Sequence, residues 1–277
     1  MKNWKVKFSS STVEFVLDGK FATIGKMVDK SNAIYITDEN VYALHQQQFK
    51  GKPTIVMPAG EAHKQQATVD FMIEALLNFG ANRQSVLIGV GGGVVTDMVG
   101  YVAGIFMRGV QFGFVPTTLL AMVDASIGGK NGIDVGVYKN MVGLIRQPAF
   151  IVYDYSFLNT LPSYQWENGF AEIIKHAAIK DAKMLQELNQ NDLAFYQKNK
   201  KALAALIQKN VEIKVKVVQK DEFEQGDRKL LNFGHTLGHA IENEHALLHG
   251  HAISIGMVYA AKISQVLLGF TGTGLLV

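Results

Sequence analysis

The feature that most constrains the fold is a glycine turn, Gly91-Gly92-Gly93, which directly follows the apolar segment Ser85–Val90. A helical pattern comes next, with apolar residues on one side at Val94, Val95, Met98 and Val102. Three glycines let a diphosphate approach the backbone, and the helix N-terminus behind them offers free N–H groups. The spacing is not G-x-G-x-x-G, so a tight structural turn is the alternative to a dinucleotide site. Either interpretation predicts a buried strand that leads straight into a helix.

Further short apolar runs separated by turns surround this unit up to about residue 160. A hairpin and buried strands are predicted at Lys5–Phe8, Val13–Leu17, Ala33–Thr37, Thr54–Met57, Ser85–Val90 and Gln111–Val115. Thr68–Phe79 places its apolar residues on one helical face, which predicts a helix between two of the strands. Strand, helix and strand with glycine turns are typical of a parallel α/β sheet.

The pattern changes near residue 160, after which glycine is scarcer and the periodicity is helical. Helices are predicted over Asn168–Lys180, Asp192–Asp221 and Thr236–Asn243. We therefore predict an α/β fold with a parallel-sheet nucleotide-binding domain at 1–160 and an all-α metal-binding domain at 161–277. A cleft between two such domains is a common place for ligands.

Composition narrows the classes of partner. With 48% hydrophobic residues the 277-residue chain can bury a large core, and a net charge of +3 is too small to argue for nucleic acid. The N-terminus lacks a signal peptide, and no window of about 18 residues is uninterruptedly apolar, so no membrane span is expected. The chain has no cysteine, which fits a cytoplasmic location and leaves His, Asp and Glu as the metal ligands.

Two further segments carry polar residues at positions where ligands bind. Asp38-Glu39-Asn40 ends a predicted strand, where a carboxylate suits ribose hydroxyls, although Asp38 as a cap of the next helix is the alternative. The stretch 115–146 is rich in glycine, with Lys130 after two glycines and Lys139-Asn140 after another turn. We interpret it as a long functional loop that neutralises a phosphate, against the alternative of an ordinary surface loop.

Five of the eight histidines fall between positions 235 and 251, namely His235, His239, His245, His249 and His251. His235 and His239 are four residues apart and would share a helical face. Chance clustering on a solvated face is the alternative to a metal or proton-transfer site. A catalytic metal needs about three protein ligands, and the third could be Glu172, Glu167 or His176.

Seven motifs in order along the chain carry a resemblance. They are Gly60-Glu61-Ala62-His63-Lys64, Gly91–Asp97, Gly100–Gly109, Pro116–Asn140, Ala171–Lys175, Leu231–Glu242 and His249-Gly250. Together, from about Asp38 to about Met257, they resemble the 3-dehydroquinate synthase family of sugar-phosphate cyclases. The resemblance implies transient NAD-dependent oxidation of 3-deoxy-arabino-heptulosonate 7-phosphate, elimination of phosphate, reduction and ring closure to 3-dehydroquinate in the shikimate pathway.

The resemblance also implies roles for individual residues. Glu172, His235 and His249 would bind a divalent metal, zinc or cobalt, and His239 would transfer a proton or contact phosphate. The phosphate side would use Lys130, Lys139, Asn140 and an Arg108 supplied by the partner subunit of a homodimer. The other substrate groups would contact Asp124, Lys175, Lys214, Arg228 and Asn232. The NAD site would comprise Asp38, Asn40, Glu61, Lys64, Gly92, Gly93, Asp97, Thr117, Thr118 and also Lys139.

Two departures qualify this resemblance. The helical domain of the family continues past Val277 and supplies a phosphate-binding lysine from that part, whereas this chain stops after the uncharged tail Phe270–Val277. We therefore expect a C-terminally truncated chain with lowered stability and weak or absent turnover. His251 stands where family members commonly carry Glu, and it is either a neutral replacement or a competing ligand.

Alternative functions remain open from the sequence. A related cyclase or an iron-dependent alcohol or glycerol dehydrogenase would share the fold, and a dehydrogenase would accumulate NADH. Lys130, Lys139, Asn140 and Arg228 favour a phosphorylated acid as substrate. An inactive fragment that still binds NAD or a partner subunit is the alternative of a different class.

Overall fold

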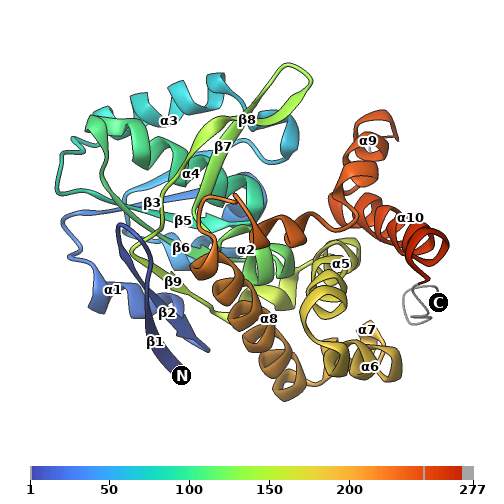
Figure 1. The fold of residues 1–277 in the computed structure, drawn as a ribbon. Helices are drawn as coiled ribbons and strands as arrows, with labels where there is room; N and C mark the ends of the chain where they lie inside the picture. Colours follow the sequence, from blue (N-terminus) through green and yellow to red (C-terminus); the bar gives the residue numbers. More distant parts are fainter. Residues whose placement is uncertain (1, 246, 270–277) are drawn as a thin grey trace. The chain divides into compact units, whose positions relative to one another are not determined.

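The structure is a computed structural model that describes residues 2–245 and 247–269 (Figure 1). It divides into two compact units, Met1–Leu161 and Pro162–Val277. The tail Phe270–Val277, on which the expectation of truncation depends, lies outside the described residues.

A seven-stranded sheet forms the centre of the first unit, in the order β1-β2-β9-β6-β5-β3-β4. Its strands are β1 (Lys2–Lys7), β2 (Thr12–Leu17), β3 (Ala33–Asp38), β4 (Thr54–Met57), β5 (Val86–Gly91), β6 (Gln111–Pro116) and β9 (Phe150–Val152). Only β1 and β2 pair antiparallel in this sheet, and every other pair is parallel. The predicted strands and the parallel α/β class are thus confirmed. All six residues of β5 are buried, as a strand covered on both faces requires.

Helices connect these strands and place the glycine turn. They are α1 (Ile24–Met27), α2 (Glu39–Phe49), α3 (Gln66–Asn78) and α4 (Gly93–Ile105), with shorter helical turns at η1 (Phe21–Thr23), η2 (Glu61–His63), η3 (Phe106–Arg108), η4 (Ala121–Ala125) and η5 (Tyr155–Thr160). Gly92 is the N-cap of α4 and follows β5 directly. The predicted change from strand to helix is therefore confirmed.

The prediction of a long loop over 115–146 is wrong. The segment contains the π-helical turn η4 and an antiparallel hairpin of β7 (Lys130–Val135) and β8 (Tyr138–Ile145) (Figure 1). Gly132 and Gly143 face each other across the hairpin, where a Cβ on Gly143 would lie 2.3 Å from the Asn131 carbonyl oxygen. Gly132 and Gly143 therefore serve close strand pairing, which a glycine count alone does not distinguish from loop formation.

The second unit is helical, as predicted. It contains α5 (Ser163–Lys180), α6 (Ala182–Gln190), α7 (Leu193–Lys198), α8 (Lys200–Lys220), η6 (Asp227–Asn232), α9 (His235–His245) and α10 (His249–Leu268). The single helix predicted over Asp192–Asp221 is in fact two, because Asn199 ends α7 and caps α8 by accepting a hydrogen bond from Ala202 N at 3.0 Å. The sequence analysis did not predict α6 or α10.

Among the described residues, α10 alone is long and apolar enough to cross a membrane by length and composition. Core helices of soluble proteins meet the same two criteria, so the finding is weak support for a span. The helix begins at His249 and carries His251 in its first turn, next to the polar side chains described below.

Candidate metal centre

Glycines let three helices of the second unit approach closely. A Cβ on Gly256 in α10 would lie 1.9 Å from the Gly234 carbonyl oxygen, just before α9. A Cβ on Gly250 would lie 2.2 Å from the carbonyl oxygen of Asn168 in α5, and Gly250 N donates to Asn168 Oδ1 at 2.6 Å. No side chain fits at either contact, so glycine there brings the ends of α9 and α10 against α5.

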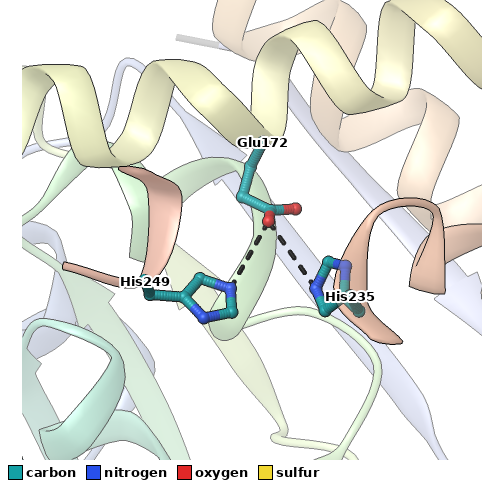
Figure 2. Close-up of side chains that lie close together, drawn as sticks. All are labelled: Glu172, His235 and His249. Atoms are coloured by element: carbon teal, nitrogen blue, oxygen red, sulfur yellow. Dashed lines mark ion pairs between the residues drawn. The ribbon is translucent and has the colours of Figure 1, made fainter. Parts of the chain in front are cut away.

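This packing brings Glu172, His235 and His249 together (Figure 2). Glu172 Oε1 lies 3.8 Å from His235 Nε2 and 3.5 Å from His249 Nε2. One potential ligand atom from each residue lies within 4.8 Å of the others. A buried carboxylate with two imidazole nitrogens is a donor set that zinc and related divalent ions accept, with a coordination position left for substrate. The residues present therefore fit a catalytic metal.

The pKa values of the two histidines beside Glu172 are shifted in opposite directions. Glu172 forms an ion pair with Lys175, one turn later in α5, and both side chains are buried. Burial, followed by the charge of Lys175, lowers the pKa of His235 to about 4. Burial also acts to lower the pKa of His249, but hydrogen bonds to Glu172 and Glu242 outweigh it and raise that pKa to about 9. His235 is thus neutral and ready to ligate, whereas metal binding must release a proton from His249.

The structure separates the three alternatives for a third ligand. Glu167 Oε2 lies 3.3 Å from His251 Nε2. His176 Nδ1 is hydrogen-bonded to Asn210 Oδ1 at 3.0 Å in the buried interior of the unit. Within the second unit, only Glu172 of the three is grouped with His235 and His249.

The remaining histidines lie at the margin of this group. The exposed His239 ring lies 5.1 Å from the His235 ring and 5.9 Å from the His249 ring, centroid to centroid. His239, Glu242 and His249 form a second group that could hold a metal, sharing His249 with the first. His245 is solvent-exposed.

The segment that precedes α9 holds two of the predicted substrate residues, Arg228 and Asn232. Asp221 organises it by accepting hydrogen bonds from the backbone N–H groups of Gln225, Gly226 and Arg228. The buried Arg228 guanidinium donates to the Glu222 carbonyl oxygen, and Asn232 Nδ2 donates to Glu224 Oε1 at 2.9 Å. Asn232 and Glu224 line an open cavity of about 580 Å³. Lys214, on α8, is also buried.

A second polar cluster lies in the first unit, around the buried Lys64. Its Nζ donates to Asp97 Oδ2 at 2.6 Å and to Asn140 Oδ1 at 2.5 Å. Asn140 has a left-handed backbone, and its N–H donates to Asp134 Oδ1 at 2.7 Å. The Asp134 N–H in turn donates to the Lys64 carbonyl oxygen at 2.8 Å. Lys64, Asp97 and Asn140 were predicted site residues, whereas Asp134 was missed.

Both halves of the chain match one family. Residues 54–168 match the family described as 3-dehydroquinate synthase N-terminal, and residues 169–275 match 3-dehydroquinate synthase C-terminal. The chain belongs to the 3-dehydroquinate synthase family.

Curated relatives agree with this assignment. A 3-dehydroquinate synthase of Nitratiruptor sp. is 42% identical over 84% of this chain and 68% of its own length. One of Bacillus pumilus (strain SAFR-032) is 39% identical over 98% of this chain and 78% of its own length. One of Buchnera aphidicola subsp. Baizongia pistaciae (strain Bp) is 44% identical over 83% of this chain and 65% of its own length. The chain thus spans about two thirds to four fifths of these relatives.

Solved structures of two cyclases are similar to this family member. One is 2-deoxy-scyllo-inosose synthase complexed with carbaglucose-6-phosphate, NAD+ and Co2+, with a TM-score of 0.85 and 27% identity over 96% of this chain and 78% of the other. The other is 2-epi-5-epi-valiolone synthase from Streptomyces hygroscopicus subsp. jinggangensis 5008 with NAD+ and Zn2+ bound, at the same TM-score, identity and coverage. A probable glycerol dehydrogenase of Sinorhizobium meliloti 1021, 13% identical with a TM-score of 0.65, covering 98% of this chain and 85% of its own, shares the fold alone.

The other matched residues of this synthase-family chain lie in the first unit. Asp38 caps α2, accepting from Val41 N at 2.9 Å, with the exposed Asn40 in the first turn. Thr117 N donates to the Gly91 carbonyl oxygen at 2.9 Å, which places Thr117 and Thr118 beside the glycine turn of Gly92 and Gly93. Burial raises the pKa of Glu61, in η2. Asp124 lies in η4, Lys130 and Lys139 on the hairpin, and Arg108 is exposed with a left-handed backbone.

Proposed function

We propose that this chain converts 3-deoxy-arabino-heptulosonate 7-phosphate to 3-dehydroquinate and phosphate. The observation that carries the proposal is the Glu172–His235–His249 set, held by three helices of a chain whose two halves both match this family. The reaction belongs to the shikimate pathway of aromatic amino acid biosynthesis, and we place it in the cytoplasm.

The cofactors proposed are NAD and a divalent metal, zinc or cobalt. Two cyclases of similar structure were crystallised with NAD+ and with Co2+ or Zn2+. When bound, NAD takes up and returns the two electrons of the transient oxidation, and the metal polarises the oxygen atom at which charge develops. The NAD site would comprise the glycine turn Gly92-Gly93, the cluster of Lys64 and Asp97, and the residues matched with them.

The chain's own residues bind the substrate and move protons. Lys130 and Lys139 neutralise the phosphate, and Asn140 helps to position it. The phosphate can itself accept the proton that elimination requires, so the protein mainly has to hold it. Arg228 binds the substrate carboxylate, and Lys175, Lys214, Asp124 and Asn232 orient its hydroxyl groups. His239, exposed beside the ligand rings, transfers protons at the hydroxyl oxygen being oxidised.

An assay of phosphate release tests this function. With NAD, Zn2+ and the heptulosonate phosphate, we expect stoichiometric phosphate release without accumulation of NADH. Accumulating NADH would identify a dehydrogenase, and absence of phosphate release from a chain that binds NAD and Zn2+ would leave a binding fragment. A neutral sugar phosphate, the ligand class of the related cyclase structure, serves as competing substrate. Preference for it would overturn the assignment of Arg228 to a carboxylate.

The proposal extends to a homodimer in which Arg108 acts in the partner's site. Arg108 is exposed beside Met107, and the hairpin of β7 and β8 exposes Val137, Tyr138 and Met141. Such an apolar surface suits contact with a second copy of the chain. If Arg108 acts across the interface, mixing inactive Arg108→Ala and Glu172→Gln chains restores turnover, because one site of each mixed dimer has both groups intact. Sedimentation velocity checks the dimer, and a failure of mixing to restore activity would contradict it.

A further inference from the structure

Both histidines of the metal centre have their Nδ1 atoms engaged, but with different acceptors. His235 Nδ1 lies 3.2 Å from the carbonyl oxygen of Phe233, two residues earlier in the chain. His249 Nδ1 lies 3.2 Å from Glu242 Oε2. In each ring the other nitrogen, Nε2, faces Glu172. The backbone thus orients one ligand, and a second carboxylate orients the other.

The placement of Glu242 follows from helix geometry. Glu242 lies seven residues after His235 in α9, which is about two helical turns, so both side chains lie on the same face. That face packs against α10, whose first residue is His249. The Glu242 side chain is only 9% exposed. A carboxylate at this depth needs strong polar partners, and the imidazole of His249 is one of them.

The charge of the group gives Glu242 a second effect. Lys175 already offsets the negative charge of Glu172, and both side chains are almost completely buried. For a divalent ion bound to Glu172, His235 and His249, the negative charge of Glu172 would therefore be largely cancelled by Lys175 and would balance little of the ion's positive charge. Glu242, next to His249, supplies a second negative charge close to the ion.

We propose that Glu242 is a positioning residue for the metal centre, fixing His249 with its proton on Nδ1 and its Nε2 lone pair directed at the ion. The inference rests on the metal centre of the proposed function. A carboxylate behind a ligating histidine sets the tautomer and ring orientation and raises the basicity of the ligating nitrogen. The same carboxylate strengthens the field at the ion, which a backbone carbonyl does less well.

Zinc affinity of matched variants tests this role. Glu242→Ala and Glu242→Gln are compared with Glu244→Ala and Glu244→Gln, since Glu244 is on the same helix but its side chain is 80% exposed. Competition with a chelator at fixed pH gives the dissociation constant, and circular dichroism of the metal-free chains checks the fold. We expect Glu242→Ala to weaken zinc binding about 10- to 100-fold. Glu242→Gln, whose amide oxygen still accepts the Nδ1 proton, is expected to lose less, and both Glu244 variants to bind as the wild type does.

Each outcome bears on a distinct statement. Unchanged zinc affinity in Glu242→Ala would overturn the inference while leaving the metal centre and the proposed function intact. Equal and complete loss of zinc in Glu242→Ala and His239→Ala, with Glu172→Gln still binding, would make Glu242 a direct ligand in the second group and also overturn it. Weakened zinc binding with no phosphate release in any variant or the wild type would support the inference and contradict the proposed function.

Discussion

Among the described residues, two buried lysines pair with carboxylates, and the two pairs are built differently. Lys175 and Glu172 are three residues apart in α5, so one helical turn brings them together. Lys64 and Asp97 are 33 residues apart, one following η2 and the other in α4. The first pair is local, and helix packing brings the histidines to it. The second pair is itself a product of the fold and is held by hydrogen bonds to the β7–β8 hairpin.

The two pairs are sensitive to different kinds of substitution. The metal centre depends on helices that approach within backbone contact, so added volume between them should damage it. The Lys64 cluster depends on a chain of hydrogen bonds through Asn140 and Asp134, so loss of one donor or acceptor should damage it. Variants of one cluster should leave the ligand of the other unaffected.

The largest effect is expected from Glu172→Gln. It removes a ligand and leaves Lys175 buried without its partner carboxylate, which costs about 3–5 kcal/mol when a buried pair is broken. We expect zinc affinity to fall more than about 100-fold, beyond the loss of an outer partner. Chelator competition and urea unfolding measure the two quantities. Glu167→Gln, on an exposed position of the same helix, is the control, and NAD binding should be unchanged in both.

Lys64→Met should give the next largest effect, confined to the first unit. Asp97 loses its cation, and since the Asp97 side chain is 21% exposed the cost is reduced to about 2 kcal/mol. NAD affinity, measured by fluorescence titration, should fall about tenfold, which corresponds to about 1.4 kcal/mol, while zinc affinity stays at the wild-type value. A parallel loss of zinc would show that the two clusters are not independent.

Gly250→Ala tests whether close helix packing positions the metal centre. The added methyl meets the Asn168 carbonyl oxygen, and overpacking of this kind costs about 1–3 kcal/mol. Thermal unfolding and zinc titration should both be affected, because α10 begins at His249. Gly25→Ala is the control, since its nearest atom is the end of Lys30 at 4.0 Å. If the Gly250→Ala chain were destabilised but kept its full zinc affinity, the close helix packing would stabilise the fold without positioning the ligands.

The smallest effect is expected from Asp134→Ala. The Asn140 N–H loses an exposed hydrogen bond, which is worth about 1 kcal/mol. NAD or phosphate affinity should drop only a few-fold, and Asp134→Asn, which retains an acceptor oxygen, should restore most of it. Isothermal titration calorimetry with NAD resolves such a difference. An Asp134→Asn chain as weak as Asp134→Ala would point to the charge and not the hydrogen bond.

The features that could be predicted from the sequence are those that depend on residues close together along the chain. The strand–glycine–helix unit, the parallel sheet and the helical second half follow from local periodicity, and the structure confirms them. The histidine cluster and the Glu172–Lys175 spacing also lie within short segments. The hairpin at 130–145 was mistaken for a loop because two of its glycines serve contacts with the opposite strand, such as Gly143 against the Asn131 carbonyl oxygen.

The family, most of the sheet strands, the helical second half and a short set of candidate ligands therefore followed from the sequence alone. The tertiary structure was needed to group Glu172, and not Glu167 or His176, with His235 and His249, and to place Glu242 beside His249 and Asp134 beside Asn140. The physical reason is that ligand geometry depends on distances of a few ångströms between separate helices and strands. Those distances are fixed by which side chains, or glycines without them, fill the contacts.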